Sequence, residues 1–239
     1  MELFKCLCGS HNWNLNVENS SDKDYKIFTT PTFDDLFNNK DYCKVTTSET
    51  EDIEISDIRK LLKMIRKPNI NYLELLFTKE LDIKTCYDSK TTELINELFS
   101  LKDKIIKINL PYLYESCMGI YSNNMYKLRK ERDNNPEYFF SYNPKTVYQA
   151  FRVLLFLKRF CQNNFENCEQ SIRFDGSDRD YILDIRNNKI PYEQIIIDSC
   201  TLYDDMEKIY KRFYINNDFD NKTYDKVEDI VKHIVKINM

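Results

Sequence analysis

Residues 3–29 read LFKCLCGSHNWNLNVENSSDKDYKIFT. The segment begins with a short apolar run and then turns at the small pair Gly9 and Ser10. Its last six residues, Asp24 to Thr29, alternate in the manner of a strand. A tight turn that follows a strand presents free backbone N–H groups, and these can hold phosphate oxygens. The segment therefore predicts two strands joined through a phosphate-binding turn.

Two carboxylates stand at the mouth of the second predicted strand. Asp22 and Asp24 are two positions apart, so an extended chain would point both to one side with their Cβ atoms about 6 to 7 Å apart. Oxygen ligands placed in this way suit a divalent cation such as Mg²⁺ or Mn²⁺. The alternative interpretation is a solvated acidic turn, because this spacing is common in acidic loops.

The rest of the N-terminal part reads as strands and helices in alternation. The pattern predicts a strand over 41–47, a helix over 57–66 that Ser56 caps and Pro68 stops, and a strand over 70–78, for which a helix is the alternative. From Thr91 onward the apolar period is helical, over 91–98, 112–132, 145–163, 193–214 and 226–237. We therefore expect an α+β fold, with a small α/β domain of mixed sheet and helices over 1–100 and an α-helical domain over 101–239.

Composition limits the class of protein. The chain has 35 basic and 39 acidic residues. This balance excludes a protein that binds nucleic acid through its overall charge, but it does not exclude a local basic groove. The eight cysteines form no CxxC pair, and the two histidines do not complete a zinc set. There is no signal-peptide pattern and no apolar run of membrane-spanning length. We expect a cytoplasmic protein with reduced cysteines and no membrane segment.

The order of the turn and the two aspartates resembles the opening block of the polymerase-β-type nucleotidyltransferases. The resemblance is to the stand-alone bacterial and phage "predicted nucleotidyltransferases", some of which are found beside RNA ligases. Four later segments are similar to that family in the same order: PNINYLELLF at 68–77, YESCMGIY at 114–121, KTVYQAFRVL at 145–154 and LDIRNNKIPYE at 183–193. Because the blocks are collinear over roughly residues 3–212, the resemblance is more specific than any single motif.

The resemblance implies an enzyme that moves a nucleoside monophosphate from an NTP to a hydroxyl acceptor and releases pyrophosphate. In that reading 1–100 is the catalytic domain, and Asp22, Asp24 and Glu74 bind Mg²⁺ or Mn²⁺. Glu74 would also help to deprotonate the acceptor hydroxyl. Gly9 and Ser10 would cradle the phosphates. Without the family pattern, Glu74 reads as a surface residue of an edge strand.

The resemblance also assigns residues of the helical part. Lys145, Tyr148 and Arg152 share one face of a predicted helix and would line the phosphate side of a cleft facing the N-terminal domain. The alternatives are that Tyr148 is a core residue and that Arg152 pairs with an acidic residue such as Asp184. For Arg186 a contact that holds two helices together and a contact with substrate are equal alternatives.

Two departures from the family pattern bear on activity. Gln149 stands where the family has histidine, so any acid–base step that uses that ring is lost, whereas a purely hydrogen-bonding role can be kept. Asn14 stands where a second glycine is usual. Since all three carboxylates are present, we expect an active enzyme.

Other classes of function stay open at this point. One alternative is a non-catalytic nucleotide- or RNA-binding module of viral or phage origin, located in the host cytoplasm. A weaker one is an interaction protein of a virus or phage, indicated only by the Asn-, Lys- and Ile-rich composition. The acceptor is open between RNA, tRNA, protein and a small molecule, and so are the preferred NTP and the oligomeric state.

Overall fold

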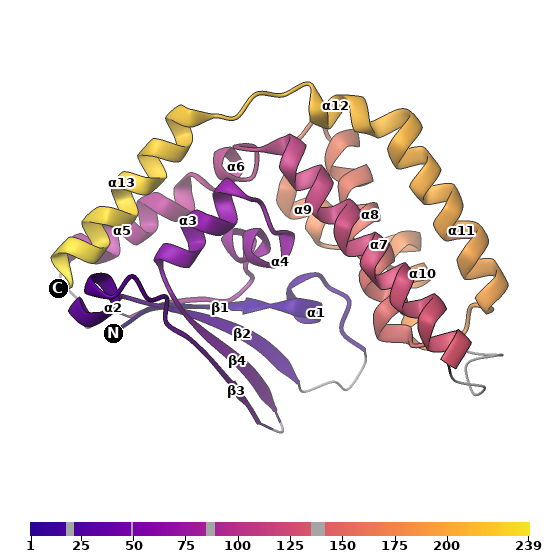
Figure 1. Cartoon of the computed structure of the whole chain (residues 1–239), viewed down its shortest axis with the longest axis horizontal. Coiled ribbons are helices and arrows are strands. Elements are labelled where there is room, and N and C mark those ends of the chain that lie inside the picture. The colour runs from indigo at the N-terminus through magenta and orange to yellow at the C-terminus, as the bar shows by residue number, and fades with distance from the viewer. Residues whose placement is uncertain (18–21, 49, 85–88, 135–141) are drawn as a thin grey trace. The chain divides into compact units, whose positions relative to one another are not determined.

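The computed structural model describes residues 1–17, 22–48, 50–84, 89–134 and 142–239 (Figure 1). The chain divides into two compact units, of which the first comprises Met1–Asn109 and Phe219–Met239 and the second Leu110–Asp218. The first unit contains a mixed β-sheet with helices, and the second is helical. The predicted α+β class is therefore confirmed.

The sheet has the strand order β3-β4-β2-β1-β5 within the described residues. Its strands are β1 (Glu2–Cys8), β2 (Lys23–Thr29), β3 (Cys43–Thr47), β4 (Glu51–Asp57) and β5 (Leu81–Ile83). β2 runs parallel to β4, and the other neighbouring pairs are antiparallel. The strands expected at 24–29 and 41–47 are present, whereas β4 and β5 had not been anticipated.

The strand expected over 70–78 is wrong, and the alternative helix is correct. This segment forms α4 (Ile70–Leu73) followed by a 3₁₀ turn, η1 (Glu74–Phe77). The side chain of Asn69 accepts a hydrogen bond from the backbone N–H of Asn71 at 3.0 Å and so caps α4. Residues 72–77 are all buried, and a run that is buried on every side has no periodicity that distinguishes a strand from a helix.

Helix α3 (Arg59–Arg66) confirms the helix expected at 57–66, but Ser56 does not cap it. Ser56 still belongs to β4, and the carboxylate of Asp57 instead accepts a hydrogen bond from the backbone N–H of Arg59 at 2.8 Å. The first turn is therefore fixed by an acidic side chain one residue later than expected.

The C-terminal helix α13 (Asn221–Ile237) packs against α3, α5 (Ser89–Ser100) and α6 (Lys102–Ile105) of the first unit. The expected division near residue 100 had assigned this helix to the helical domain. Val227, Ile230, Val231 and Ile234 are buried at helical spacing, which shows the amphipathic stripe that the sequence predicts. The stripe identifies a packing face but not the unit on which it packs.

One face of the sheet forms the core of the first unit together with these helices. The rings of Phe4 on β1 and Phe28 on β2 lie 5.1 Å apart, and the ring of Phe99 on α5 meets Phe4 edge-on at 5.3 Å. Two short helices, α1 (Gly9–Asn12) and α2 (Phe33–Phe37), complete the unit. α1 follows β1 directly and begins the region described below.

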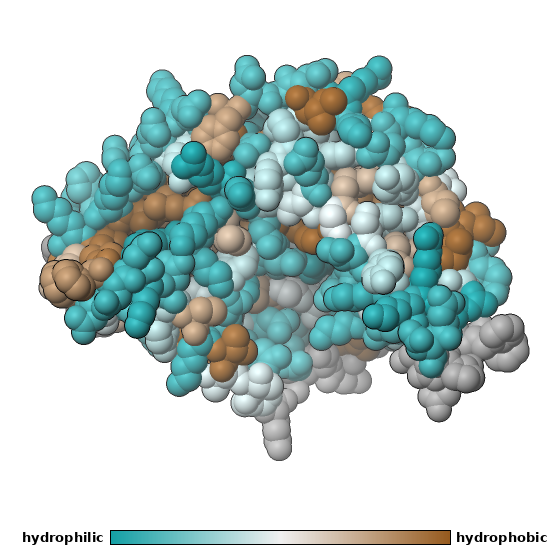
Figure 2. Space-filling model, in the orientation of Figure 1, coloured by the Kyte–Doolittle hydropathy of each residue, from teal (hydrophilic) through white to brown (hydrophobic). Residues whose placement is uncertain are grey.

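The second unit consists of helices built mainly around α7 (Leu110–Asn134) and α8 (Pro144–Gln162). It continues with α9 (Cys168–Ile172), α10 (Gly176–Arg186), α11 (Tyr192–Asp205), a π-helical turn η3 (Met206–Tyr210) and α12 (Lys211–Ile215). No helix in the described part of the chain is both long and apolar enough to cross a membrane. Hydrophilic residues cover most of the face shown in Figure 2.

Candidate active site

The site begins where β1 ends and the chain turns at Gly9. Gly9 has φ +66°, a left-handed conformation that costs little only for glycine. A Cβ atom built on Gly9 would lie 2.1 Å from Oδ2 of Asp24, so the carboxylate fills the space that any side chain would need. Gly9 is therefore required by both its backbone conformation and its contact with Asp24.

The register of the sheet explains why Asp24 lies at this turn. Asp24 on β2 pairs with Cys8 on β1 and with Asp52 on β4. Paired residues on neighbouring strands point to the same face of a sheet, so Asp52 stands beside Asp24. Oδ1 of Asp52 is buried and has no hydrogen-bond partner among the described residues. A buried carboxylate oxygen of this kind is suited to a cation.

Glu74 reaches the same turn from η1 and is only 2% exposed. Its Oε2 accepts a hydrogen bond from Nδ2 of Asn12 at 3.0 Å, and its Oε1 accepts a longer one from the backbone N–H of Gly9 at 3.4 Å. Oδ1 of Asn12 in turn accepts from the backbone N–H of Lys79 at 3.1 Å. An amide and a backbone N–H are thus among the partners that allow this carboxylate to be buried, and these contacts link α1 to η1.

Two buried thiols border the turn. Burial raises the pKa of Cys6 and Cys8 well above the usual thiol range, and the negative charge of Glu74 raises both further. Asp24 adds a smaller contribution of the same sign at Cys8. These cysteines are therefore neutral thiols at physiological pH, which makes them poor nucleophiles and poor metal ligands.

The next row of the same sheet face carries a network of opposite charges. Lys26 is paired in register with Glu54, whose carboxylate accepts hydrogen bonds from Lys26, from Lys60 and from the hydroxyl of Tyr72. The ammonium groups of Lys26 and Lys60 lie 4.5 and 4.8 Å from the centre of the Tyr72 ring. Lys26 from β2 and Lys60 from α3 thus place two cations around Glu54, one row away from Asp24 and Asp52.

The structure brings together some of the residues expected at the site. Asp24, Gly9 and Glu74 share the turn, whereas Asp22 lies one residue before β2 and is exposed. Ser10 lies in α1 and is half-buried. Over the residues that the structure describes, no three or more Cys, His, Asp or Glu side chains come together so as to hold a metal ion.

Two residues of this site were missed at the level of sequence, namely Asn12 and Asp52. Asp52 lies in the stretch EDIEISD, which alternates over its length and becomes β4. Recognition of that alternation would have predicted the strand and an acidic residue at its start, but not its pairing with β2. Asn12 gave no local signal, because its importance comes from contacts with residues more than sixty positions away.

The predicted residues of the helical part lie on α8, which starts as expected. Pro144 occupies the first turn, and the side chain of Asn143 accepts hydrogen bonds from the backbone N–H groups of Lys145 and Thr146. Lys145 is exposed, whereas Tyr148 and Arg152 are each only 6% exposed. The expected polar stripe is thus solvent-facing only at its start.

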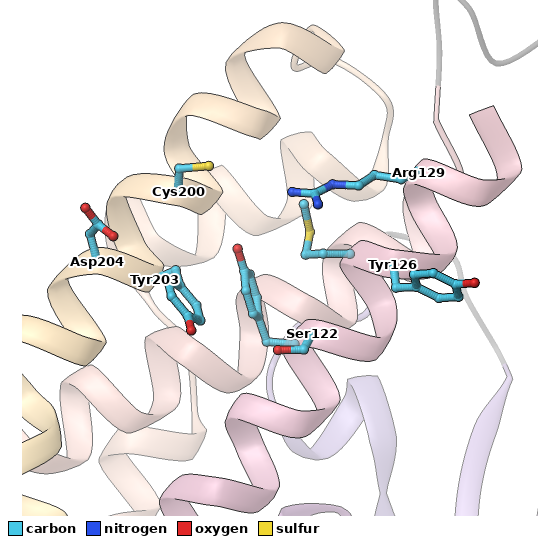
Figure 3. Close-up of a pocket in the computed structure, with 8 residues that line it drawn as sticks. Ser122, Tyr126, Arg129, Cys200, Tyr203 and Asp204 are labelled. Carbon is cyan, nitrogen blue, oxygen red and sulfur yellow. The ribbon is translucent and has the colours of Figure 1, made fainter. Parts of the chain in front are cut away.

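The second unit also contains a concave pocket between α7 and α11, with a cavity of about 300 Å³ (Figure 3). Its walls include Tyr121 and Tyr203, whose rings stack 5.5 Å apart at an interplanar angle of 25°. Arg129 on α7 and Cys200 on α11 point toward one another across the cavity, whereas Tyr126 points away from it (Figure 3). The pocket combines aromatic walls with a guanidinium group, which suits a flat polar ligand.

Comparison with known proteins assigns no family to this chain. No protein-family model matches the sequence, and no curated protein matches it either. Any functional conclusion therefore depends on the residues of the site and on their geometry. At the Gly9 turn the described residues bring together the carboxylates of Asp24 and Glu74.

Proposed function

We propose that this protein is a divalent-metal-dependent nucleotidyltransferase of the polymerase-β type. It would transfer a nucleoside monophosphate from an NTP to a hydroxyl of an acceptor and release pyrophosphate. The observation that carries the proposal is the packing of the Asp24 carboxylate against Gly9. That contact puts a cation ligand next to a backbone turn that can hold phosphate oxygens, which is the combination that a metal–triphosphate complex needs.

The residues at the turn fit Mg²⁺ or Mn²⁺. Asp52 offers a buried oxygen that no described group hydrogen-bonds, and Asp24 stands beside it in register. Asp22, two residues earlier, is exposed and would add a third carboxylate. When bound, the metal would supply charge neutralisation of the triphosphate and polarisation of the transferred phosphoryl group. The NTP's own phosphate oxygens would complete the ligand set.

We assign Glu74 a positioning role in this scheme. The resemblance made it the third metal ligand, but its oxygens accept hydrogen bonds from Asn12 and from the backbone of Gly9. These contacts support a role in fixing the conformation of the turn. Asp52 is better suited to act as the third ligand, because it shares the sheet face of Asp24.

The chain's own groups account for the remaining requirements of the transfer. Ser10 would hold the phosphate oxygens with its backbone N–H and its hydroxyl, and the N–H of Gly9 would join them by exchanging its long hydrogen bond to Glu74 for one to phosphate. The acceptor oxygen bonds to the α-phosphorus while the bond from that phosphorus to the pyrophosphate oxygen breaks. The proton of the acceptor hydroxyl would pass to a carboxylate, for which we assign Asp52. Lys26, one row away, pairs with Glu54.

The proposal is tested by incubating the protein with each α-³²P-labelled NTP, Mg²⁺ or Mn²⁺, and pools of RNA, tRNA and protein. We expect metal-dependent pyrophosphate release and transfer of label to one pool. Asp52→Asn should abolish both, whereas Asp82→Asn on the edge strand β5, whose carboxylate pairs with Lys84 at 2.7 Å, should change neither. Equal activity of both variants would contradict the assignment.

A second candidate function is nucleotide or RNA binding without turnover. The pocket between α7 and α11 favours it, because stacked tyrosine walls and an arginine can hold a base irrespective of catalysis. Under this alternative, labelled nucleotide or RNA binds but no pyrophosphate is released. Tyr203→Ala would then weaken binding, and Asp24→Asn would leave it unchanged.

A further inference from the structure

We infer that a groove in the second unit, lined by α8, α10 and α11, binds a small organic amine whose ammonium group lies at Asp198. The inference goes beyond the proposed nucleotidyl transfer and does not rest on it, because the described residues of the groove have no part in that reaction. Among the described residues, the groove also shares no lining residue with the pocket between α7 and α11 in Figure 3.

The floor of the groove is apolar. Its most buried lining residues are Phe151 on α8 and Leu202 on α11, which are 2% and 8% exposed, and Leu155 lies one turn after Phe151. The ring of Tyr181 on α10 adds an aromatic wall, 5.8 Å from the ring of Phe151 at an interplanar angle of 58°. The cavity has a volume of about 320 Å³, which lies in the range of small-molecule pockets. A surface of this kind suits the hydrocarbon body of a ligand.

Several polar lining residues come from one side of α11. Asp198, Thr201 and Asp205 stand at i, i+3 and i+7, so they share a face of the helix with Leu202. The two aspartates are two turns apart, about 10 Å along the helix axis. A carboxylate thus stands toward each end of the apolar floor.

The two carboxylates differ in their partners. Asp205 forms an ion pair with Lys158 of α8, whose Nζ lies 3.7 Å from Oδ2. Asp198 accepts hydrogen bonds from the hydroxyl of Tyr181 at 2.5 Å and from Nε2 of Gln194 at 2.8 Å. Both donors are neutral, so they orient this carboxylate without neutralising its charge. The described lining residues therefore carry two carboxylates and one ammonium group, which sum to one negative charge.

This charge balance favours one class of ligand. An ammonium group would form a charge-assisted hydrogen bond with Asp198, and the nearby Tyr181 ring would add an attraction to the cation. Burial and, after it, the hydrogen bond to Asp198 raise the pKa of Tyr181, so the phenol stays protonated and keeps Asp198 in place. An anion would be repelled by the net negative charge, and a diamine would bring its second charge toward Lys158. The groove thus matches a monoamine with an apolar body.

The inference is tested by isothermal titration calorimetry of the full-length protein with hexylamine, hexanol and hexanoate, which share one type of hydrocarbon chain and differ in charge. We expect hexylamine to bind about tenfold or more tightly than hexanol, because only the amine forms a hydrogen bond between two charged groups. Hexanoate should show no detectable binding. Phenethylamine, titrated in the same way, shows whether the preferred apolar body is aliphatic or aromatic.

Three variants locate the site. Asp198→Asn keeps the volume of the side chain and removes its charge, so it should weaken hexylamine binding by about tenfold or more and leave hexanol binding nearly unchanged. Thr201→Trp places an indole in the groove from an exposed position and should abolish binding of both compounds. Asp204→Asn is the matched control, because Asp204 is an exposed residue of the same helix that pairs with Lys208 at 2.6 Å outside the groove. This variant should bind hexylamine as wild type does, and far-UV circular dichroism would show that each variant is folded.

Absence of hexylamine binding, or equal affinity for hexylamine and hexanol, would overturn the inference. Hexylamine binding at wild-type strength in Asp198→Asn or in Thr201→Trp would do the same, because the amine would then lie elsewhere. Equal losses in Asp198→Asn and Asp204→Asn would indicate general surface charge and would also overturn it. Weaker binding in Asp198→Asn alone of the two would support the inference whether or not the protein releases pyrophosphate from an NTP, so the two proposals are tested separately.

Discussion

Oδ2 of Asp24 lies where the side chain of residue 9 would begin, 2.1 Å from the position of an ideal Cβ on Gly9. The two residues are fifteen positions apart in sequence, and the pairing of β1 with β2 brings them together. The contact makes the backbone turn and the carboxylate a single structural unit. A side chain at position 9 would displace the carboxylate, and this dependence leads to the first prediction.

Gly9→Ala should lower both stability and activity. An alanine at φ +66° costs about 1–2 kcal/mol, and its methyl group must push the Asp24 carboxylate aside. We expect pyrophosphate release to fall by about 100-fold or more, because a misplaced metal ligand acts directly on the transition state. Urea denaturation and a pyrophosphate assay measure the two effects.

Gly119→Ala is the matched control for that variant. Gly119 lies within α7, and a Cβ there would meet nothing within 4 Å. Because alanine is a better helix former than glycine, this variant should be as stable as wild type or up to about 1 kcal/mol more stable. If Gly9→Ala behaved in the same way, the structural role given to the Gly9 turn would be wrong.

Asn12→Ala should destabilise the first unit by about 1.5–3 kcal/mol, the usual contribution of a hydrogen bond to a charged group. The substitution leaves the buried Glu74 carboxylate without its 3.0 Å hydrogen bond from Asn12. Asn38→Ala removes an exposed side-chain hydrogen bond to Asp34 and should cost much less. Denaturation curves of the two variants that shift by the same amount would show that Glu74 does not depend on Asn12.

The network around Glu54 should make folding sensitive to acid. Burial raises the pKa of Glu54, but hydrogen bonds from Lys26, Lys60 and Tyr72 outweigh burial and lower the pKa to about 2. An unfolded glutamate has a pKa of about 4.3. The stabilisation of the fold by ionised Glu54 is therefore complete above about pH 5 and is lost as pH falls toward 2. The free energy of unfolding of wild type should therefore drop across this window more steeply than that of Glu54→Gln. Parallel slopes would exclude the network as the cause.

Two substitutions on α8 should show how the loss of an exposed cation differs from the loss of a buried one in its effect on stability. Lys145 is exposed, so Lys145→Ala should change stability by no more than about 0.5 kcal/mol while it weakens NTP binding. Arg152 is buried, so Arg152→Ala should lower the melting temperature as well as weaken NTP binding. Thermal melting with and without NTP measures both effects. NTP binding at wild-type strength in both variants would contradict the nucleotide-binding role that the resemblance implies for α8.

Local patterns in the sequence predicted the elements whose signals are local. The turn at Gly9 follows from an apolar run before a small residue, and the start of α8 follows from Asn143 and Pro144. The segment 70–78 was assigned wrongly because a fully buried run carries no periodicity. A segment with one buried and one exposed side has a periodicity that predicts its structure, whereas a segment that is buried on all sides does not.

The features that the sequence did not predict depend on contacts between residues that are far apart in the chain. The position of Asp52 beside Asp24 depends on the parallel pairing of β2 and β4, and the role of Asn12 depends on η1. The meeting of Arg186 with Tyr148 depends on how α10 packs on α8. In each case the residue type suggests some chemistry, but the partner is set by tertiary packing, which a local pattern does not encode.

The most direct test of the account is metal-dependent pyrophosphate release by wild type and by Asp24→Asn. The amide keeps the volume of the carboxylate next to Gly9 but removes the charge that binds the cation. We predict that release falls by about 100-fold or more, while the melting temperature stays the same or rises as repulsion from Asp52 is relieved. Release at the wild-type rate by a folded Asp24→Asn protein would contradict the assignment of the Gly9 turn as the catalytic centre.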